Sequence, residues 1–447
     1  MKTQCHRRLW MRRFMILLSL LLLVPASLAV AAEPIQPDET LTLDRCLELA
    51  LQQHPSIRGA SGAVEVNRSR VEQAKAPYYP QIDAAASYDR LTSAVPNSPA
   101  GTSDDPRDQY GAGVTVKQLL YDFGKTPAQV GVQSANLTAA QADYQNVSDQ
   151  VIFNTKQAYY GILKAARTRE VAAETVKQFQ QHLDQAKSFF EVGTRPKFDV
   201  TKAEVDLSNA QLNLIKAENA LRIARVVLNN AMGLPNAPEY NLEDNLAFAP
   251  FGLRLEDALQ TAYDNRPDLK SVLAKQLAAE RAMQVARKGY YPTLSGNASY
   301  TGAAESLPLE DGWDVGVTAT FPIFSGFLTK NQVEEAGAAL NIQTASAEVL
   351  RQAIYLDVQQ AYLNLREAEE RISTAALTVK QAEENHAIAN GRYTAGVGNP
   401  IEVTDAEITL INAKTTHIAA LYDYRIAQST IEKAMGEKGI ARKQGDR

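Results

Sequence analysis

Apolar residues recur every three or four positions through two stretches of the chain, residues 190–231 and residues 393–434. The second stretch repeats the first 203 residues later. In each, a glycine (Gly193, Gly396) precedes a heptad pattern in which alanine alternates with larger side chains. Sustained spacing of this kind predicts helices that pack side by side over a long distance, and the alanines allow a close approach.

The segment before each glycine predicts an even longer helix. No proline follows Pro127 until after Gly193, so about 65 residues at ~1.5 Å per residue would form roughly 100 Å of helix. Alanines recur at matching seven-residue steps in the second copy, from Ala361 to Ala389. Because helices of globular proteins seldom exceed about 25 residues, this length favours a coiled-coil or tubular assembly.

The period of the pattern changes from 3.6 to 2 after two copies of a Tyr-Tyr-Pro tripeptide, at residues 78–80 and 290–292. Two alternating segments follow each copy, which predicts four strands of about ten residues in two hairpins. One face of each strand is apolar and the other is small and polar, as in transmembrane β-strands. We expect their connecting loops at residues 92–109 and 302–312.

Aromatic residues gather near the predicted strand ends, where membrane proteins place interfacial girdles. The main members of this set are Tyr78, Tyr79, Tyr290, Tyr291 and Trp313. A half-buried soluble sheet is the alternative, since alternation alone does not identify a membrane strand. Four strands cannot close a barrel, so the barrel would be shared between chains. Two chains would give about eight strands and a filled interior, and three would give twelve and room for a channel.

Residues 1–32 are predicted to be a signal peptide. Four arginines precede an apolar run, and the sequence Ala-Val-Ala at residues 29–31 resembles a cleavage site. Removal of this segment takes away five basic residues and no acidic one, which leaves 41 Lys and Arg against 51 Asp and Glu. An acidic chain of this kind is a poor candidate for binding nucleic acid. Cys46 is then the remaining cysteine of the sequence, so no internal disulfide is expected.

The chain is therefore expected to be one doubled unit. The predicted divisions are a signal peptide (1–32), a first repeat (33–232) with a β-hairpin near 81–120 and a helical hairpin near 127–231, a connector (233–252), a second repeat (253–436) with a β-hairpin near 293–324 and a helical hairpin near 329–434, and a tail (437–447). The leader at residues 33–40 is expected to be loose.

The chain resembles the TolC family of outer membrane factors over about residues 40–436. The specific matches are Leu-Tyr-Asp-Phe-Gly at 120–124, Ile-Phe-Ser-Gly at 323–326, the two Gly-x-x-x-x-x-(Asp/Glu)-Val turns and the Met-Gly pairs at 232–233 and 435–436. The resemblance implies an α+β membrane protein: a trimeric, 12-stranded outer-membrane β-barrel, with four strands per chain, continued by a periplasmic α-helical coiled-coil barrel.

The same resemblance implies a function and partners. Such a homotrimer would sit in outer-membrane lipid, dock a periplasmic adaptor and an inner-membrane transporter, and export drugs, metals or polypeptides with energy supplied by the pump. No cofactor is implied. The turns match the tips that adaptors engage, with the residues Gly193, Thr194, Arg195, Pro196, Gly396, Val397, Gly398, Asn399 and Pro400.

Two acidic residues after the second turn, Glu402 and Asp405, match positions that line the closed entrance in this family, and Asp199 is the counterpart in the first copy. Three copies would bring rings of carboxylates into a narrow mouth, where they attract cations. The alternative is that they are ordinary acidic residues in the first turn of a helix, worth under about 1 kcal/mol each. The second turn has Gly398 where family members often place an arginine that holds the tip closed, so a contact of that kind through the second copy is in doubt.

The sequence offers no sign of catalysis. It has neither a phosphate-binding loop nor a nucleophile elbow, and no histidine has a metal-ligand partner at local spacing, so we expect neither an enzyme nor a metal site. His386 and His417 fall on the heptad seam and are expected to be polar insertions in the helical wall. The function predicted is an outer-membrane export duct, and the alternative is a periplasmic coiled-coil scaffold without a pore.

Overall fold

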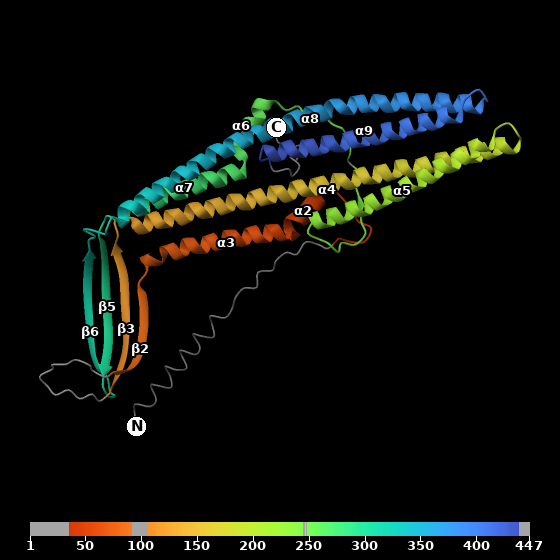
Figure 1. Ribbon diagram of the computed structural model, residues 1–447. Coiled ribbons are helices and arrows are strands. Elements are labelled where there is room, and N and C mark those ends of the chain that lie inside the picture. The colour runs from red at the N-terminus through yellow and green to blue at the C-terminus, as the bar shows by residue number, and fades with distance from the viewer. Residues whose placement is uncertain (1–34, 92–105, 245, 247, 438–447) are drawn as a thin grey trace.

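The computed structural model describes residues 35–91, 106–244, 246 and 248–437, so the predicted signal peptide and most of the first strand loop lie outside the described residues. The protein is elongated, with a sheet at one end and two helical hairpins that reach to the other end (Figure 1). None of the described helices has a stretch that is both long and apolar enough to cross a membrane.

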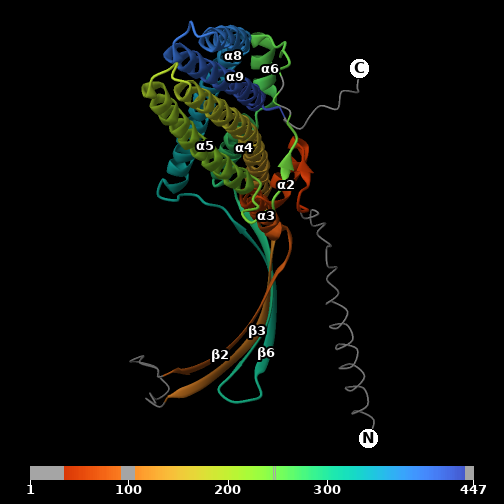
Figure 2. The ribbon, with the colours of Figure 1, turned by 90° about the vertical axis from the view of Figure 1, so that its right-hand side faces the viewer.

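Four antiparallel strands form one sheet in the order β2-β3-β5-β6. They are β2 (Gln81–Leu91), β3 (Arg107–Tyr121), β5 (Thr293–Ala304) and β6 (Glu310–Thr320). The loop between β5 and β6 is residues 305–309, shorter than the predicted 302–312, because pairing continues to Ala303 and Glu310. Likewise β3 begins at Arg107, inside the loop predicted at residues 92–109. Figure 2 shows that the sheet curves along its length.

The strand register places residues of one kind in rows across all four strands. One row is Ile82, Val116, Ala298 and Val315, and a second apolar row is Ala84, Val114, Tyr300 and Trp313. The row between them, on the other face, is polar: Asp83, Thr115, Ser299 and Asp314. Since one-residue shifts would move every side chain to the opposite face, the pairing keeps one side of the whole sheet apolar and the other polar.

The strands join the long helices through tight turns with left-handed residues. The Asp122 carboxylate accepts hydrogen bonds from the backbone N–H groups of Gly124, Lys125 and Thr126, and so caps the first turn of α4 (Lys125–Glu191). Gly124 has φ +86°. At the second joint Phe327 has φ +65° and precedes α8 (Leu328–Thr394). The sequence motifs at residues 120–124 and 323–326 are thus the bends between sheet and helix.

In the helical layer, the two helices of each hairpin pack against each other. Helix α4 packs against α5 (Lys197–Ala231), and α8 packs against α9 (Pro400–Ala434). The two hairpins meet where α4 contacts α9. Nearer the sheet, α3 (Pro55–Lys75), followed by the short 3-10 helix η2 (Ala76–Tyr78), packs on α4, and α7 (Pro267–Lys288) packs between α4 and α8. Near the tips the hairpins are also joined by contacts of α4 with α8 and of α5 with α9, as in the Phe189–Tyr393 ring pair and the Thr404–Asp206 hydrogen bond.

Short elements surround the middle of the helical layer. Helix α2 (Leu43–Gln53) packs on α4, and α6 (Leu255–Asn265) packs on α8. Strand β1 (Thr40–Leu41) pairs in parallel with β4 (Asn241–Leu242), so the end of the leader that we expected to be loose is held against the connector. This pairing encloses an apolar cluster that includes Cys46 and Tyr159, both fully buried.

Candidate channel entrance at the helical tips

The two helical hairpins end in turns of the same design, residues 192–196 and 395–399, which we call the tip turns. Gly193 and Gly396 adopt the left-handed conformation, with φ +76° and +78°. The N–H of the next residue in each turn donates a hydrogen bond to a carbonyl five residues earlier: Thr194 to the Phe189 carbonyl at 3.0 Å and Val397 to the Arg392 carbonyl at 3.1 Å. These bonds satisfy carbonyls at the ends of α4 and α8, which explains why both repeats keep the glycine.

The second tip turn is the tighter of the two. A Cβ atom at Gly398 would lie 2.7 Å from the Tyr393 nitrogen, so no other side chain fits there without a shift of the backbone. The Asn399 side chain then accepts a hydrogen bond from the Ile401 N–H at 3.0 Å and caps α9, which begins at Pro400. Glycine at residue 398 is therefore required by the space inside the turn.

Arg195 connects the two turns. Its Nη2 donates a hydrogen bond to the Gly398 carbonyl at 3.0 Å, and its guanidinium lies 5.3 Å from the centre of the Tyr393 ring. Tyr393 is 3% exposed. Burial raises the pKa of the Tyr393 hydroxyl, with the Asp199 carboxylate adding to the rise and Arg195 opposing it. Within the chain, the arginine that contacts the second turn thus comes from the first copy of the repeat and binds the backbone of the second.

Glu402 and Asp405 both lie on the exposed side of α9, close to one turn apart. The Glu402 carboxylate is 3.7 Å from Arg392, and both side chains are about half exposed, so the pair contributes little to stability. Both carboxylates are available to solvent, as an entrance residue would need to be. Their role at an entrance stays a prediction.

Asp199 does not share this position. It is buried, at 6% exposure, and its Oδ2 atom has no hydrogen-bond partner within the described part of the chain. It lines a small cavity between the hairpins with Tyr393, Val403 and Thr404. The sequence repeat equates Asp199 with Glu402, but the contact between the hairpins covers Asp199, and its role at an entrance stays a prediction.

The aromatic residues predicted at the membrane interfaces are exposed. Tyr78 and Tyr79 precede β2, and Tyr290 and Tyr291 precede β5, so all four lie at the end of the sheet next to the helices. Trp313, which is 75% exposed, lies beside Tyr300 toward the other half of the sheet. These positions are compatible with two aromatic girdles.

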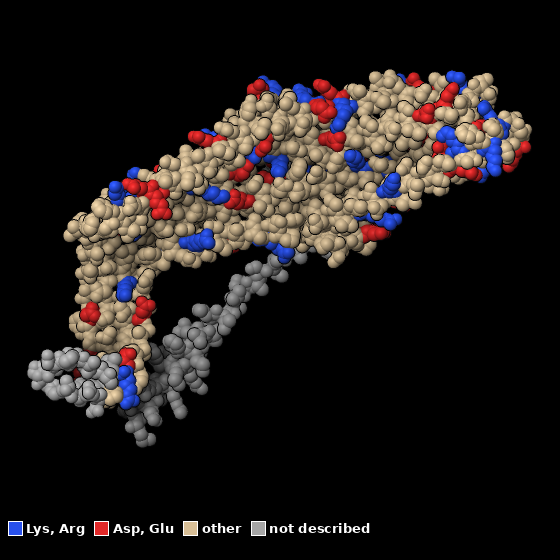
Figure 3. Space-filling model, viewed as in Figure 1, with Lys and Arg blue, Asp and Glu red and all other residues tan. Residues whose placement is uncertain are grey.

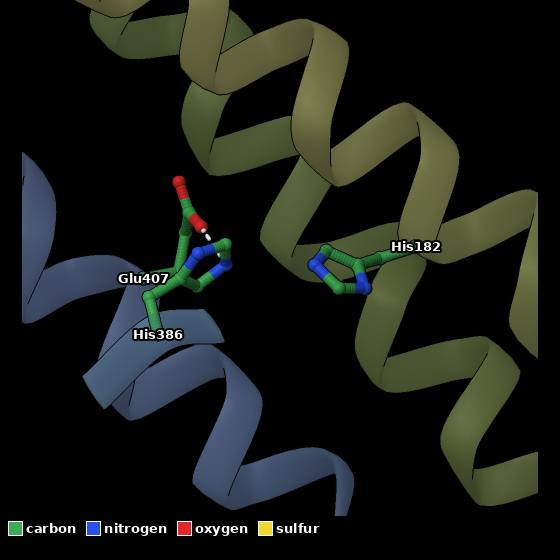
Figure 4. A group of neighbouring side chains, drawn as sticks. All are labelled: His182, His386 and Glu407. Atoms are coloured by element: carbon green, nitrogen blue, oxygen red, sulfur yellow. Dashed lines mark ion pairs between the residues drawn. The ribbon is translucent and has the colours of Figure 1, made fainter. Parts of the chain in front are cut away.

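Between the hairpins, the structure brings together a group that sequence spacing did not reveal. His182 of α4, His386 of α8 and Glu407 of α9 point toward one another (Figure 4), and their ligand atoms all lie within 4.8 Å of one another. The His386 Nε2 atom is 2.6 Å from the Glu407 carboxylate. The expectation of no metal site was based on local spacing, and these residues come from three separate helices.

Charge is unevenly distributed over the visible face. The sheet carries few charged side chains, while acidic and basic side chains gather at the far end, over the tip turns (Figure 3). An apolar sheet surface at one end and a charged tip at the other suit a molecule that meets lipid at the first and water or a protein at the second.

Comparison with known proteins decides the family. The sequence profile of the outer membrane efflux protein family matches residues 46–234 and 258–437. The chain belongs to this family. It is 26% identical over 421 residues to the protein CyaE of Bordetella pertussis, covering 91% of this chain and 86% of that protein. It is 24% identical over 407 residues to the outer membrane protein TolC of Escherichia coli, covering 86% and 80%.

The fold agrees with this membership. The crystal structure of CusC superposes with a TM-score of 0.78 at 18% identity, covering 91% of this chain and 96% of that one. As an outer membrane efflux protein, the chain is located in the outer membrane and takes part in transport, and nothing in this family role calls for catalysis. The predicted family and location are thereby confirmed.

Proposed function

We propose that three copies of this chain form a continuous duct across the outer membrane and the periplasm, which passively carries substrates delivered by an inner-membrane transporter through a periplasmic adaptor. The observation that supports the proposal is that both the sheet and the helical layer of the described chain have two free edges, with unpaired backbone groups in the sheet and exposed apolar side chains on the helices. Each edge of the sheet continues into the same edge of the helical layer.

The first pair of edges belongs to the sheet. Strands β2 and β6 are its outer strands, and each has ladder groups that no described strand of the chain pairs. Unpaired backbone groups in a bilayer cost several kcal/mol each, so strands at membrane depth must pair with further strands. Pairing of β2 with β6 of another copy would satisfy both edges at once.

The second pair of edges belongs to the helices, where apolar side chains face outward at seven-residue steps. On α5 they include Phe198, Val205, Leu212 and Val226, and on α8 they include Ile342, Val349, Leu356, Leu363 and Leu377. All of these side chains are 53–67% exposed in the single chain. A heptad stripe of this kind is the surface that a neighbouring helix covers in a coiled coil.

The sheet and the helical layer have their first-repeat and second-repeat elements at the same two edges, so one arrangement of neighbouring copies would pair the edges of both. The elements of the first repeat, β2, α3 and α5, occupy one edge, and β6 and α8 of the second repeat occupy the other (Figure 1). Contacts between unlike edges are head-to-tail, and they form a ring when the rotation between neighbouring copies closes. Three copies give twelve strands, enough for a channel, and four long helices from each give a matching helical tube.

In this assembly the tip turns are at the end opposite the membrane, where an adaptor would engage residues 193–196 and 396–400. Glu402 and Asp405 would line the entrance as carboxylate rings that attract cations. The energy for transport comes from the inner-membrane transporter, and the cargo is set by that partner. The outer-membrane lipid would contact the apolar rows of the sheet.

Planar-bilayer recording of the detergent-purified chain tests the proposal, with the mass of the particle determined in the same detergent. The expected result is discrete conductance steps from a particle of three chains. A two-chain or single-chain particle would refute the trimer. A trimer without conductance at any voltage would refute the duct and support a scaffold.

A further inference from the structure

We propose that His182, His386 and Glu407 form a binding site for one divalent transition-metal ion, with Zn²⁺ the best suited, between the two helical hairpins. Two imidazoles and a carboxylate are a ligand set that Zn²⁺ uses in proteins, with a water molecule as the fourth ligand. All three residues belong to one chain, so the site does not depend on the assembly.

The geometry requires only small side-chain movements. Ligands about 2.0–2.1 Å from a tetrahedral zinc ion lie roughly 3.3 Å from each other. The His386 and Glu407 atoms are now closer than this, at 2.6 Å, while the set as a whole spans no more than 4.8 Å. A movement of the His182 ring toward the pair by up to about 1.5 Å, from 4.8 Å to roughly 3.3 Å, would complete the site. Figure 4 shows the His182 ring facing the other two across the contact between the hairpins.

The contact between His386 and Glu407 is close, but it is not a well-directed hydrogen bond. His386 Nε2 is buried and has no hydrogen-bond partner of good geometry among the described residues. Buried polar atoms normally have such a partner, and one without it calls for an explanation. A metal ion between Nε2 and the carboxylate would supply the missing interaction.

Glu407 is the anchor of the site. It is 1% exposed, and a buried carboxylate needs a cation or several donors. With its amide nitrogen turned toward Glu407, Gln178 of α4 donates a hydrogen bond to the carboxylate Oε2 at 3.3 Å. A donor of this kind orients a ligating carboxylate, as outer-shell partners do in metal sites.

The charges around the cluster come from each helix packed there. Lys414 of α9 lowers the pKa of Glu407 and pairs with Glu174 of α4 at 3.5 Å, and Asp206 of α5 acts on His182. Burial, with a contribution from His386, lowers the pKa of His182, so this imidazole is neutral at pH 7 and available as a ligand. Burial raises the pKa of Glu407, with His386 opposing, and a bound cation would favour its ionised form.

The site would tie the two hairpins together close to the tips. His182 is nine residues before the end of α4, His386 is eight before the end of α8, and Glu407 is seven after the start of α9. At ~1.5 Å per residue, the site lies roughly 11–14 Å from the tip turns. A bound ion would resist any separation of α4 from α8 and α9. Its effect on conductance rests on the proposed function, but the binding itself does not.

Co²⁺ replaces Zn²⁺ in such sites and reports its geometry, so it is the probe for the test. The full chain, purified in detergent and freed of metal, is titrated with Co²⁺ and then with Zn²⁺ as a competitor. We expect one ion per chain, visible absorption of tetrahedral Co²⁺ without a thiolate charge-transfer band, and displacement by one equivalent of Zn²⁺. His182→Gln removes the ligand from one hairpin and leaves the His386–Glu407 pair in place.

His417→Gln is the matched control, because it removes a histidine of α9 that lies outside the cluster. His182→Gln should weaken Zn²⁺ binding by more than about 100-fold, since the loss of even an outer-shell partner costs 10–100-fold. His417→Gln should not change it. Equal Zn²⁺ affinity in wild type and His182→Gln, or octahedral Co²⁺ only, would overturn the proposal. If the ion binds but leaves bilayer conductance unaltered, the site stands and its effect on opening is refuted.

Discussion

The Arg195 guanidinium of the first tip turn donates a hydrogen bond to the Gly398 carbonyl of the second, at 3.0 Å, and lies over the Tyr393 ring. The hydrogen bond connects the two helical hairpins through residues that are 203 positions apart in the sequence. We predict that Arg195→Ala loosens the tips and raises the mean single-channel conductance of the reconstituted protein. The physical reason is the loss of both a charge-assisted hydrogen bond and a cation–π contact.

Two variants separate these contributions. Arg195→Lys keeps the positive charge but loses the planar group, and should give an intermediate conductance. Gly398→Ala leaves Arg195 intact but forces the second turn to move, because its Cβ would lie 2.7 Å from the Tyr393 nitrogen, and should resemble Arg195→Ala. If all three variants conduct as the wild type does, the contact between the turns does not restrain the entrance.

We predict that replacing Glu402 and Asp405 by alanine raises conductance and weakens block by divalent and trivalent cations. The reason is that exposed carboxylates near the axis of a narrow entrance attract cations at close range. The measurement is the half-blocking concentration of a trivalent cation added at the tip side. Glu204→Ala, an exposed acidic residue of α5, serves as the control. Unaltered block in the double variant would exclude these residues from the entrance.

The apolar face of the sheet gives a prediction about membrane insertion. Val315→Arg should destabilise the membrane-inserted form by about 2–4 kcal/mol if residue 315 lies near the bilayer midplane. Thr318→Arg places the same charge on the opposite face of the same strand and should insert normally. The yield of heat-modifiable trimer in outer-membrane fractions measures the difference. A normal yield for Val315→Arg would show that this face does not meet lipid.

Much of the fold could be predicted because it rests on patterns that are local in sequence. The alternation of apolar and polar residues on either side of Val114 and Val315 predicted strands. The pairing across the sheet confirms that the apolar residues of neighbouring strands lie on the same face. The heptads ending at Ala231 and Ala434 defined the second helix of each hairpin. The loop at residues 305–309 was overestimated because glycines at 302 and 312 look like turn residues but lie within paired strands.

The site was harder to predict because it depends on packing between the repeats. Asp199 and Glu402 occupy equal positions in the repeat, yet one faces α9 and is buried while the other faces solvent. His182, His386 and Glu407 share no local sequence motif, because they lie on three different helices and come together only where α4 packs near α8 and α9. A sequence pattern indicates which face of a helix is buried, but it does not indicate which other helix packs against that face.

Cys46 allows a test of the buried cluster that holds α2 against the connector. Burial raises the pKa of its thiol to about 12, with Arg45 opposing and Glu39 adding to the rise. At pH 8 the thiolate fraction is therefore roughly 1000-fold below that of a free cysteine. In a chain carrying Cys5→Ser, we expect iodoacetamide to modify Cys46 at least about 1000-fold more slowly in the folded protein than in denaturant.

The same shift predicts how stability depends on pH. Above pH ~8.5 the unfolded chain loses the thiol proton while the folded chain keeps it, so the unfolded state is favoured by about tenfold per pH unit from this group, up to a pH near 12. Cys46→Ala should therefore show a shallower loss of melting temperature than the Cys5→Ser chain between pH 8.5 and 10. Rapid modification of the folded chain, or identical pH profiles for the two chains, would mean that the cluster around α2 is open to solvent.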